Sequence, residues 1–225
     1  MTENAPPAIE IHDLQKRYDG VLAVRGVSFS LAHGEVLGLL GGNGAGKTTT
    51  IGMIMGLVLP SAGSVKVFGV DMAKDRYAVL PRMNFESPYV DMPHRLTVRQ
   101  NLEVFGRLYG VDRIKARITD LACELHLEAF LDRESGALSA GQKTRVALAK
   151  SLINEPDLLL LDEPTASLDP DTADWVRTRL ETYRKLRGAS ILLASHNMGE
   201  VERLCDRVII MKAGAIADEG TPDNL

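Results

Sequence analysis

Cysteine is scarce in this 225-residue sequence, which contains only Cys123 and Cys205. Two isolated thiols form neither a disulfide framework nor the paired spacing of a zinc site, and they suit a reducing compartment. Long apolar runs are also missing, because the longest nearly apolar stretch, residues 51–59, is far shorter than the ~20 residues of a membrane-spanning helix. We therefore expect any work at a membrane to be done through a partner.

Positive charge is not concentrated in the chain, since no block of lysine and arginine is present and the formal net charge is -4. This balance predicts no nucleic-acid-binding face. Residues 1–7 contain no basic region followed by an apolar stretch, so we expect no secretory leader. With 45% hydrophobic and 25% charged residues, the chain has the ordinary composition of a globular protein with one large or two small domains.

The sequence does contain a complete phosphate-binding loop, Gly41-Gly42-Asn43-Gly44-Ala45-Gly46-Lys47-Thr48-Thr49. A short apolar run at residues 36–40 precedes the loop and a segment that can form a helix, residues 50–57, follows it, as this motif requires. Its glycines allow backbone N–H groups to point at a phosphate, and the helix N-terminus adds partial positive charge. We expect the whole loop to bind a nucleoside triphosphate, with Lys47 at the β- and γ-phosphates and Thr48 on Mg²⁺.

The rest of the chain predicts strands that alternate with helices. Apolar runs and alternating patterns predict further strands at residues 8–12, 27–31, 63–68, 158–161, 189–195 and 208–211. Helical periodicity extends over about residues 97–131. A cap at Asp169 followed by a first-turn proline begins another helix, which Gly188 ends.

These elements predict an α/β fold: a P-loop NTPase core, made of a parallel sheet with helices, beside an N-terminal antiparallel β-subdomain. A helical subdomain is inserted into this core. We expect one domain over residues 1–225, in which residues 1–87 and 152–225 form the core and residues 88–151 form the insertion.

Two acidic residues follow the leucine-rich strand at residues 158–161. Asp162 is placed to hold the hydration shell of Mg²⁺, and Glu163 is placed to activate water. An acidic pair after a buried strand can also cap a helix, but the phosphate loop upstream favours the catalytic alternative.

Within the insertion, the string Leu138-Ser139-Ala140-Gly141-Gln142 precedes a run that can form a helix, residues 143–152. It differs only at Ala140 from Leu-Ser-Gly-Gly-Gln, the signature of the ATP-binding subunits of ABC transporters. With the phosphate loop before it and the acidic strand after it, the chain resembles such a subunit from about residue 9 to residue 222. The segments at residues 97–110 and 195–198 are most similar to subunits paired with export-type permeases.

The resemblance implies further roles. Tyr18 would stack on adenine, although it can also be a plain surface tyrosine. His196 would contact the γ-phosphate, although a lone histidine is more often structural. Ser167 and Asp169 would belong to a loop between subunits. The signature residues Ser139, Ala140, Gly141 and Gln142 would reach ATP held by a second subunit, so hydrolysis would need a head-to-tail dimer closed around ATP.

One departure from the family concerns a glutamine expected to touch Mg²⁺ and sense the membrane partner. The chain contains only Gln15, Gln100 and Gln142, and Gln100 falls in an expected helix. Glu86 is our candidate for that position and for a third Mg²⁺ contact. The family's usual proline is replaced by Gly42, whose backbone tolerates more conformations.

The implied function is ATP hydrolysis that powers a separate integral membrane permease, at the cytoplasmic face of the cell membrane. One alternative is a soluble ABC-type ATPase of DNA repair or translation, which the single cassette and the missing basic patch disfavour. A second is a nucleotide-binding regulator without turnover, which the intact Glu163 and His196 disfavour. The transported substrate is not encoded in this chain, because the permease selects it.

Overall fold

The computed structural model describes residues 5–87, 91–166 and 168–224. An antiparallel sheet with strand order β2-β1-β4-β5 is formed by the N-terminal part of the chain. Its strands are β1 (Ile9–Tyr18), β2 (Val21–Leu31), β4 (Ala62–Val67) and β5 (Val70–Asp71). The strands expected at residues 8–12 and 27–31 are confirmed but longer, because β1 and β2 pair as a hairpin as far as Tyr18 and Val21.

The central sheet has the order β10-β9-β3-β8-β7-β6, and all its described neighbours are parallel except β9 and β10. Its strands are β3 (Val36–Leu40), β6 (Met83–Glu86), β7 (Leu158–Asp162), β8 (Ser190–Ser195), β9 (Arg207–Lys212) and β10 (Ala215–Gly220). Helix α1 (Lys47–Ile54) follows β3, and α2 (Met72–Asp75) follows β5. The α/β architecture with two sheets is thereby confirmed.

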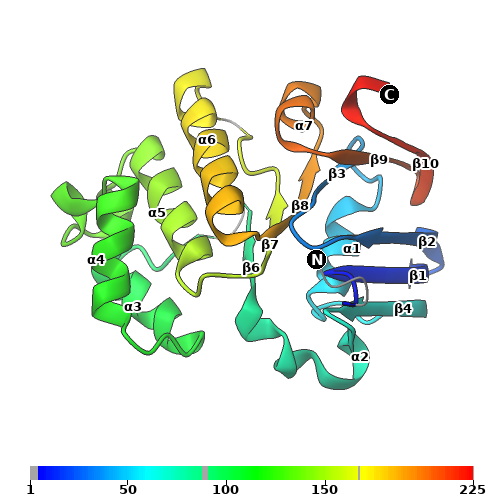
Figure 1. Cartoon of the computed structure of the whole chain (residues 1–225), viewed down its shortest axis with the longest axis horizontal. Helices are drawn as coiled ribbons and strands as arrows, with labels where there is room; N and C mark the ends of the chain where they lie inside the picture. Colours follow the sequence, from blue (N-terminus) through cyan, green and yellow to red (C-terminus); the bar gives the residue numbers. More distant parts are fainter. Residues whose placement is uncertain (1–4, 88–90, 167, 225) are drawn as a thin grey trace.

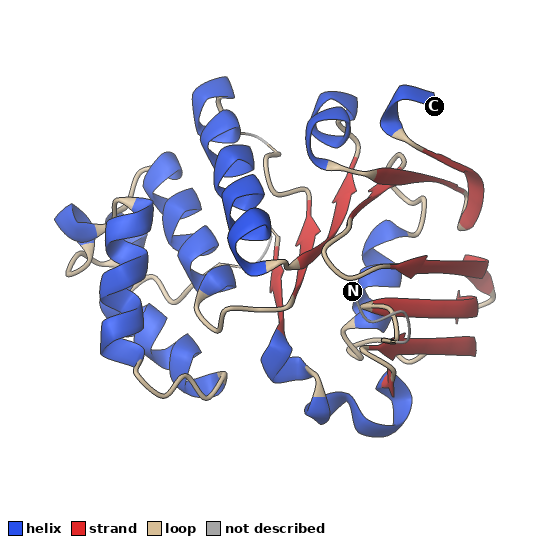
Figure 2. Cartoon of the chain, in the orientation of Figure 1, coloured by secondary structure: helices blue, strands red, loops and turns tan. Residues whose placement is uncertain are grey.

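The inserted helices are α3 (Val98–Leu108), α4 (Ile114–Leu125) and α5 (Ala140–Leu152). They form one end of the molecule and the antiparallel sheet forms the other, with the central sheet between them (Figure 1; Figure 2). Helices α6 (Pro170–Arg187) and α7 (Met198–Leu204) pack beside the central sheet. None of the helices in the described ranges is long and apolar enough to cross a membrane.

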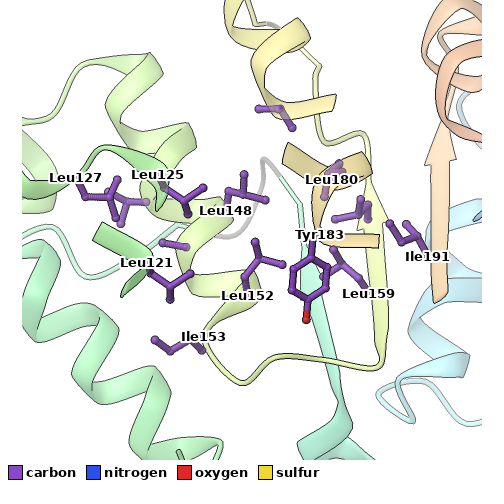
Figure 3. Packing of buried hydrophobic residues seen from close by; sticks show 14 of the residues in the cluster. Leu121, Leu125, Leu127, Leu148, Leu152, Ile153, Leu159, Leu180, Tyr183 and Ile191 are labelled. Atoms are coloured by element: carbon purple, nitrogen blue, oxygen red, sulfur yellow. The ribbon is translucent and has the colours of Figure 1, made fainter. Parts of the chain in front are cut away.

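The central sheet separates two hydrophobic clusters, because successive strand residues point to opposite faces. On β7, Leu158 and Leu160 belong to the cluster shared with α1 and the antiparallel sheet. Leu159 and Leu161 belong to the other cluster, which α4, α5 and α6 complete (Figure 3). The insertion therefore shares its core with the central sheet.

Local capping explains where the helices near the site begin. Asp169 accepts a hydrogen bond from the Thr172 backbone N–H at 3.0 Å and starts α6, which ends at Gly188 with φ at 64°. The expected start and end of this helix are confirmed. Ser139 starts α5 through a reciprocal pair of hydrogen bonds with Gln142.

Candidate nucleotide-binding site

The phosphate-binding loop connects the end of β3 to the start of α1. Gly46 has φ at 102°, and a side chain there would lie 2.9 Å from the Ala23 carbonyl oxygen. A side chain at Gly41 would collide with the Met211 carbonyl. Glycine is therefore required at both ends of the loop, and the loop delivers the N-terminus of α1 to the site.

The Lys47 ammonium lies inside this loop. It is 7% exposed, and it donates to the Gly41 carbonyl at 2.6 Å and to the Gly42 carbonyl at 3.4 Å. The Glu163 carboxylate is 3.8 Å away. A partly desolvated ammonium beside a cluster of backbone N–H groups is suited to bind phosphate oxygens.

A second contact at the site joins Thr48 to Asp162. The Thr48 hydroxyl donates to an Asp162 carboxylate oxygen at 2.8 Å. Burial raises the pKa of Asp162, and the charge of Glu163 adds to that shift, whereas the Thr48 hydrogen bond and Lys47 oppose it. A hydroxyl and a carboxylate fit Mg²⁺, which is typically held by one or two carboxylates together with substrate phosphates.

Glu163 and His196 form a second pair at the ends of neighbouring strands. Their side chains approach to 2.7 Å, between Glu163 Oε2 and His196 Nδ1. Glu163 adopts a left-handed backbone conformation with φ at 56°, and its N–H donates to the Ala194 carbonyl at 2.8 Å. This hydrogen bond to β8 holds Glu163 just beyond the carboxyl end of β7, where its carboxylate lies close to both Lys47 and His196.

A cavity of about 310 Å³ lies over the loop. The residues that line it are Tyr18, Ala23, Gly42, Asn43, Gly44, Ala45, Gly46, Lys47, Thr48, Thr49, Asp162 and Glu163. The structure thus brings Tyr18 to the phosphate loop. The residue is 44% exposed, and the Lys16 ammonium lies 4.9 Å from the centroid of its ring.

The signature lies elsewhere in the structure. Ser139 caps α5, and Ala140 is exposed in the first turn of that helix. Of the described residues that line the loop cavity, none belongs to residues 139–142. Asp169 caps α6, and Ser167 lies outside the described residues. The first turn of α5 is therefore exposed at Ser139 and Ala140 and is not part of the described lining of the loop cavity.

Glu86 is not brought to Thr48 and Asp162. It pairs in register with Leu161, whose side chain faces α5 and α6, so Glu86 points to the face of the sheet opposite Asp162. There its carboxylate lies 2.8 Å from the Lys150 ammonium of α5. Burial raises the pKa of Glu86, and Lys150 opposes this shift. This position does not support the Mg²⁺ contact expected of Glu86.

The contacts of the buried polar side chains behind the site were not predictable from the sequence; these side chains include Lys150, Thr165, Ser195 and Glu200. Lys150 lies among buried apolar residues of α5. Its place within this apolar stripe is the only feature of the sequence that could have indicated a buried lysine. Thr165, Ser195 and Glu200 lie close in sequence to Glu163 and His196, but nothing in their spacing indicates that they contact one another.

Comparison with known proteins identifies the family. The model of the family described as ABC transporter matches residues 24–166. Nod factor export ATP-binding protein I of Burkholderia orbicola (strain AU 1054) is 41% identical over 225 residues, which cover 96% of this chain and 72% of the relative.

Two solved structures are similar over nearly the whole chain. One is described as an ATP binding subunit of an ABC transporter, with 30% identity, a TM-score of 0.87, and coverage of 96% of this chain and 91% of that chain. The other is cbiO1 from Clostridium perfringens, part of the ABC transporter complex cbiONQ. It has 31% identity and a TM-score of 0.85, and the match covers 96% of this chain and 89% of that chain.

Proposed function

The chain belongs to the ABC transporter family as an ATP-binding and ATP-hydrolysing subunit, and we propose that it powers export through a separate integral membrane permease. The observation that carries the catalytic part is the convergence of Lys47, Glu163 and His196 at one edge of the central sheet. The direction of transport rests on similarity to a relative named for export.

In this proposal the loop from Gly41 to Thr49, which includes Lys47, binds the triphosphate, and Tyr18 contacts the base. Thr48 and Asp162 would hold Mg²⁺, which neutralises charge on the β- and γ-phosphate oxygens. Glu163 takes a proton from the attacking water. His196, held by Glu163 at Nδ1, has Nε2 left to contact the γ-phosphate.

A second subunit completes the site. The exposed N-terminus of α5, with Ser139 and Gly141, is proposed to bind the γ-phosphate of ATP in the loop of a partner copy or a similar subunit. Asp169 would lie between the subunits. We propose no nucleic acid as a partner in this arrangement.

The permease is proposed to bind at a groove between the core and α3. This docking groove has a volume of about 630 Å³, and its walls are mostly apolar. Its lining includes Leu57, Tyr77 and Leu108, which are 75%, 71% and 75% exposed. Large apolar side chains exposed in one patch mark an interaction site. The docked subunit would lie at the cytoplasmic face of the cell membrane, where cellular ATP is available.

Copurification with a detergent-solubilised membrane protein tests this proposal. We expect the tagged chain to retain an integral membrane partner, and Leu108→Arg to release it while ATP binding stays unchanged. Leu186→Arg is the matched control, because Leu186 is 76% exposed on α6, outside the residues that line the groove. Retention of the membrane partner by Leu108→Arg would exclude the docking groove as the site where the permease binds. Copurification with DNA-repair or translation factors alone would overturn the transport function.

A further inference from the structure

Glu200, in the first turn of α7, is a buried carboxylate with two hydroxyl donors. It is 1% exposed. One of its oxygens accepts a hydrogen bond from the Thr165 hydroxyl at 2.7 Å, and the other accepts one from the Ser195 hydroxyl at 2.7 Å. Among the described residues, no lysine, arginine or histidine forms an ion pair with it. A buried carboxylate is costly unless it is hydrogen-bonded, so both hydroxyls are held in these orientations.

The two donors belong to the segments that carry the reacting side chains. Thr165 follows Glu163 by two positions, and Ser195 directly precedes His196. The Ser195 carbonyl also accepts from the Gly41 N–H at 3.4 Å, at the start of the phosphate loop. Glu200 therefore bonds to the loop after β7 and to the end of β8, where that strand meets the phosphate loop.

We propose that Glu200 is a positioning residue for ATP hydrolysis, which fixes Glu163 and His196 at their 2.7 Å separation by holding Thr165 and Ser195. The inference rests on the proposed roles of Glu163 and His196. Glu200 itself lines none of the described surface of the loop cavity, so it acts through the two hydroxyls. Small displacements of reacting groups are costly because the reaction demands close alignment.

The consequence is a selective effect on turnover. Thr165→Val keeps the shape of the side chain and removes one donor, so we expect kcat to fall by about tenfold to a hundredfold. The KM for ATP should change by less than about twofold, because the phosphate loop is untouched. Glu200→Gln should retain most of kcat, since its amide can accept from one hydroxyl and donate to the other oxygen. Glu200→Ala should lose as much kcat as Thr165→Val or more.

Coupling between the two positions distinguishes positioning from general destabilisation. In the Glu200→Ala background, Thr165→Val should lower kcat no further, because its partner is already absent. Ser151→Ala is the matched control: Ser151 is fully buried, and its hydroxyl bonds to the Leu148 carbonyl in α5. It should leave kcat and KM at wild-type values. Thermal melting of every variant shows which of them are folded at the assay temperature.

The experiment is steady-state ATP hydrolysis by the purified chain, with Glu163→Gln measured in parallel. Wild-type kcat in Thr165→Val, additive losses in the double variant, or equal losses in Ser151→Ala would each overturn the role of Glu200. If Glu200→Ala is unfolded, Thr165→Val and Glu200→Gln decide the question by themselves. Turnover retained in Glu163→Gln would instead refute the proposed base, which separates the two failures.

Discussion

Thr48 and Asp162 are 114 positions apart, yet the hydroxyl of one donates to the carboxylate of the other at 2.8 Å. Strand β8 lies between β3 and β7 in the central sheet, and all three are parallel. Their carboxyl ends therefore meet at one edge, where ligands bind in open α/β sheets. The contact joins the nucleotide loop to the acidic strand and defines the proposed Mg²⁺ site.

Asp162→Asn should weaken Mg²⁺ binding in the presence of ATP. Replacing a group that orients the metal or its waters typically lowers metal affinity by about 10- to 100-fold. Calorimetric titration of Mg²⁺ into the ATP-bound protein measures this change. Asp218→Asn, at an exposed position of β10, is the control and should behave as wild type. Equal Mg²⁺ affinity in both variants would remove Asp162 from the metal site.

Lys47→Ala should weaken ATP binding by about tenfold to a hundredfold or more. The variant loses a charge-assisted contact to desolvated phosphate, which costs about 1.5–3 kcal/mol or more. Calorimetry with ATP gives the affinity directly, and Lys185→Ala, an exposed lysine on α6, serves as the control. Near-native affinity in Lys47→Ala would contradict the assignment of this loop.

Glu163→Gln should bind ATP, lose turnover by about 10²–10⁴-fold, and accumulate as a dimer with ATP but not with ADP. The amide cannot take a proton from water, so the γ-phosphate that the partner's α5 would hold is preserved. Light scattering with each nucleotide measures the assembly.

Adding Ser139→Arg to Glu163→Gln should prevent closure while monomer ATP binding remains. The substitution fills the proposed contact with a bulky side chain. It also removes the cap of α5, at a cost of about 1 kcal/mol to helix stability. ATP-induced dimers that persist in this background would show that the signature does not form the interface.

Glu86→Leu should destabilise the fold by about 3–5 kcal/mol, because it leaves the buried Lys150 ammonium without its partner. Glu86→Leu combined with Lys150→Met should recover most of that loss, since an apolar pair of similar volume replaces a buried ion pair. Urea unfolding of both variants measures the free energies of unfolding. Equal stability of the single and double variants would show that the pair is not coupled.

Cys205 should resist thiol reagents at pH 8, whereas Cys123 should react. Burial raises the pKa of the Cys205 thiol to about 12, so the nucleophilic thiolate is scarce at pH 8. Cys123 is exposed. Mass spectrometry after maleimide treatment should find one modified thiol in the native chain and none in Cys123→Ser. Rapid labelling of Cys205 in the folded variant would contradict its buried position.

Features that depend on a few adjacent residues were predictable from the sequence. Helix α6 begins after Asp169 and ends before Gly188, because a side-chain cap and a glycine in the left-handed region act locally. The helical pattern at residues 97–131 did not show the break between α3 and α4, where Gly110 has φ at 72°. Strand β6 was not predicted, because its four residues have little pattern of their own and owe their conformation to pairing with β7.

The sequence by itself determined the chemistry of the site: a glycine loop for phosphate, a hydroxyl and a carboxylate suited to Mg²⁺, and Glu163 and His196 at strand ends. Tertiary structure decided which side chains share a face. Packing pairs Glu86 with Lys150 on the face of the sheet opposite Asp162, and it brings Glu200 within hydrogen-bonding distance of Thr165 and Ser195. Motifs are encoded by neighbouring residues, whereas strand register and buried partners depend on packing between segments far apart in the chain.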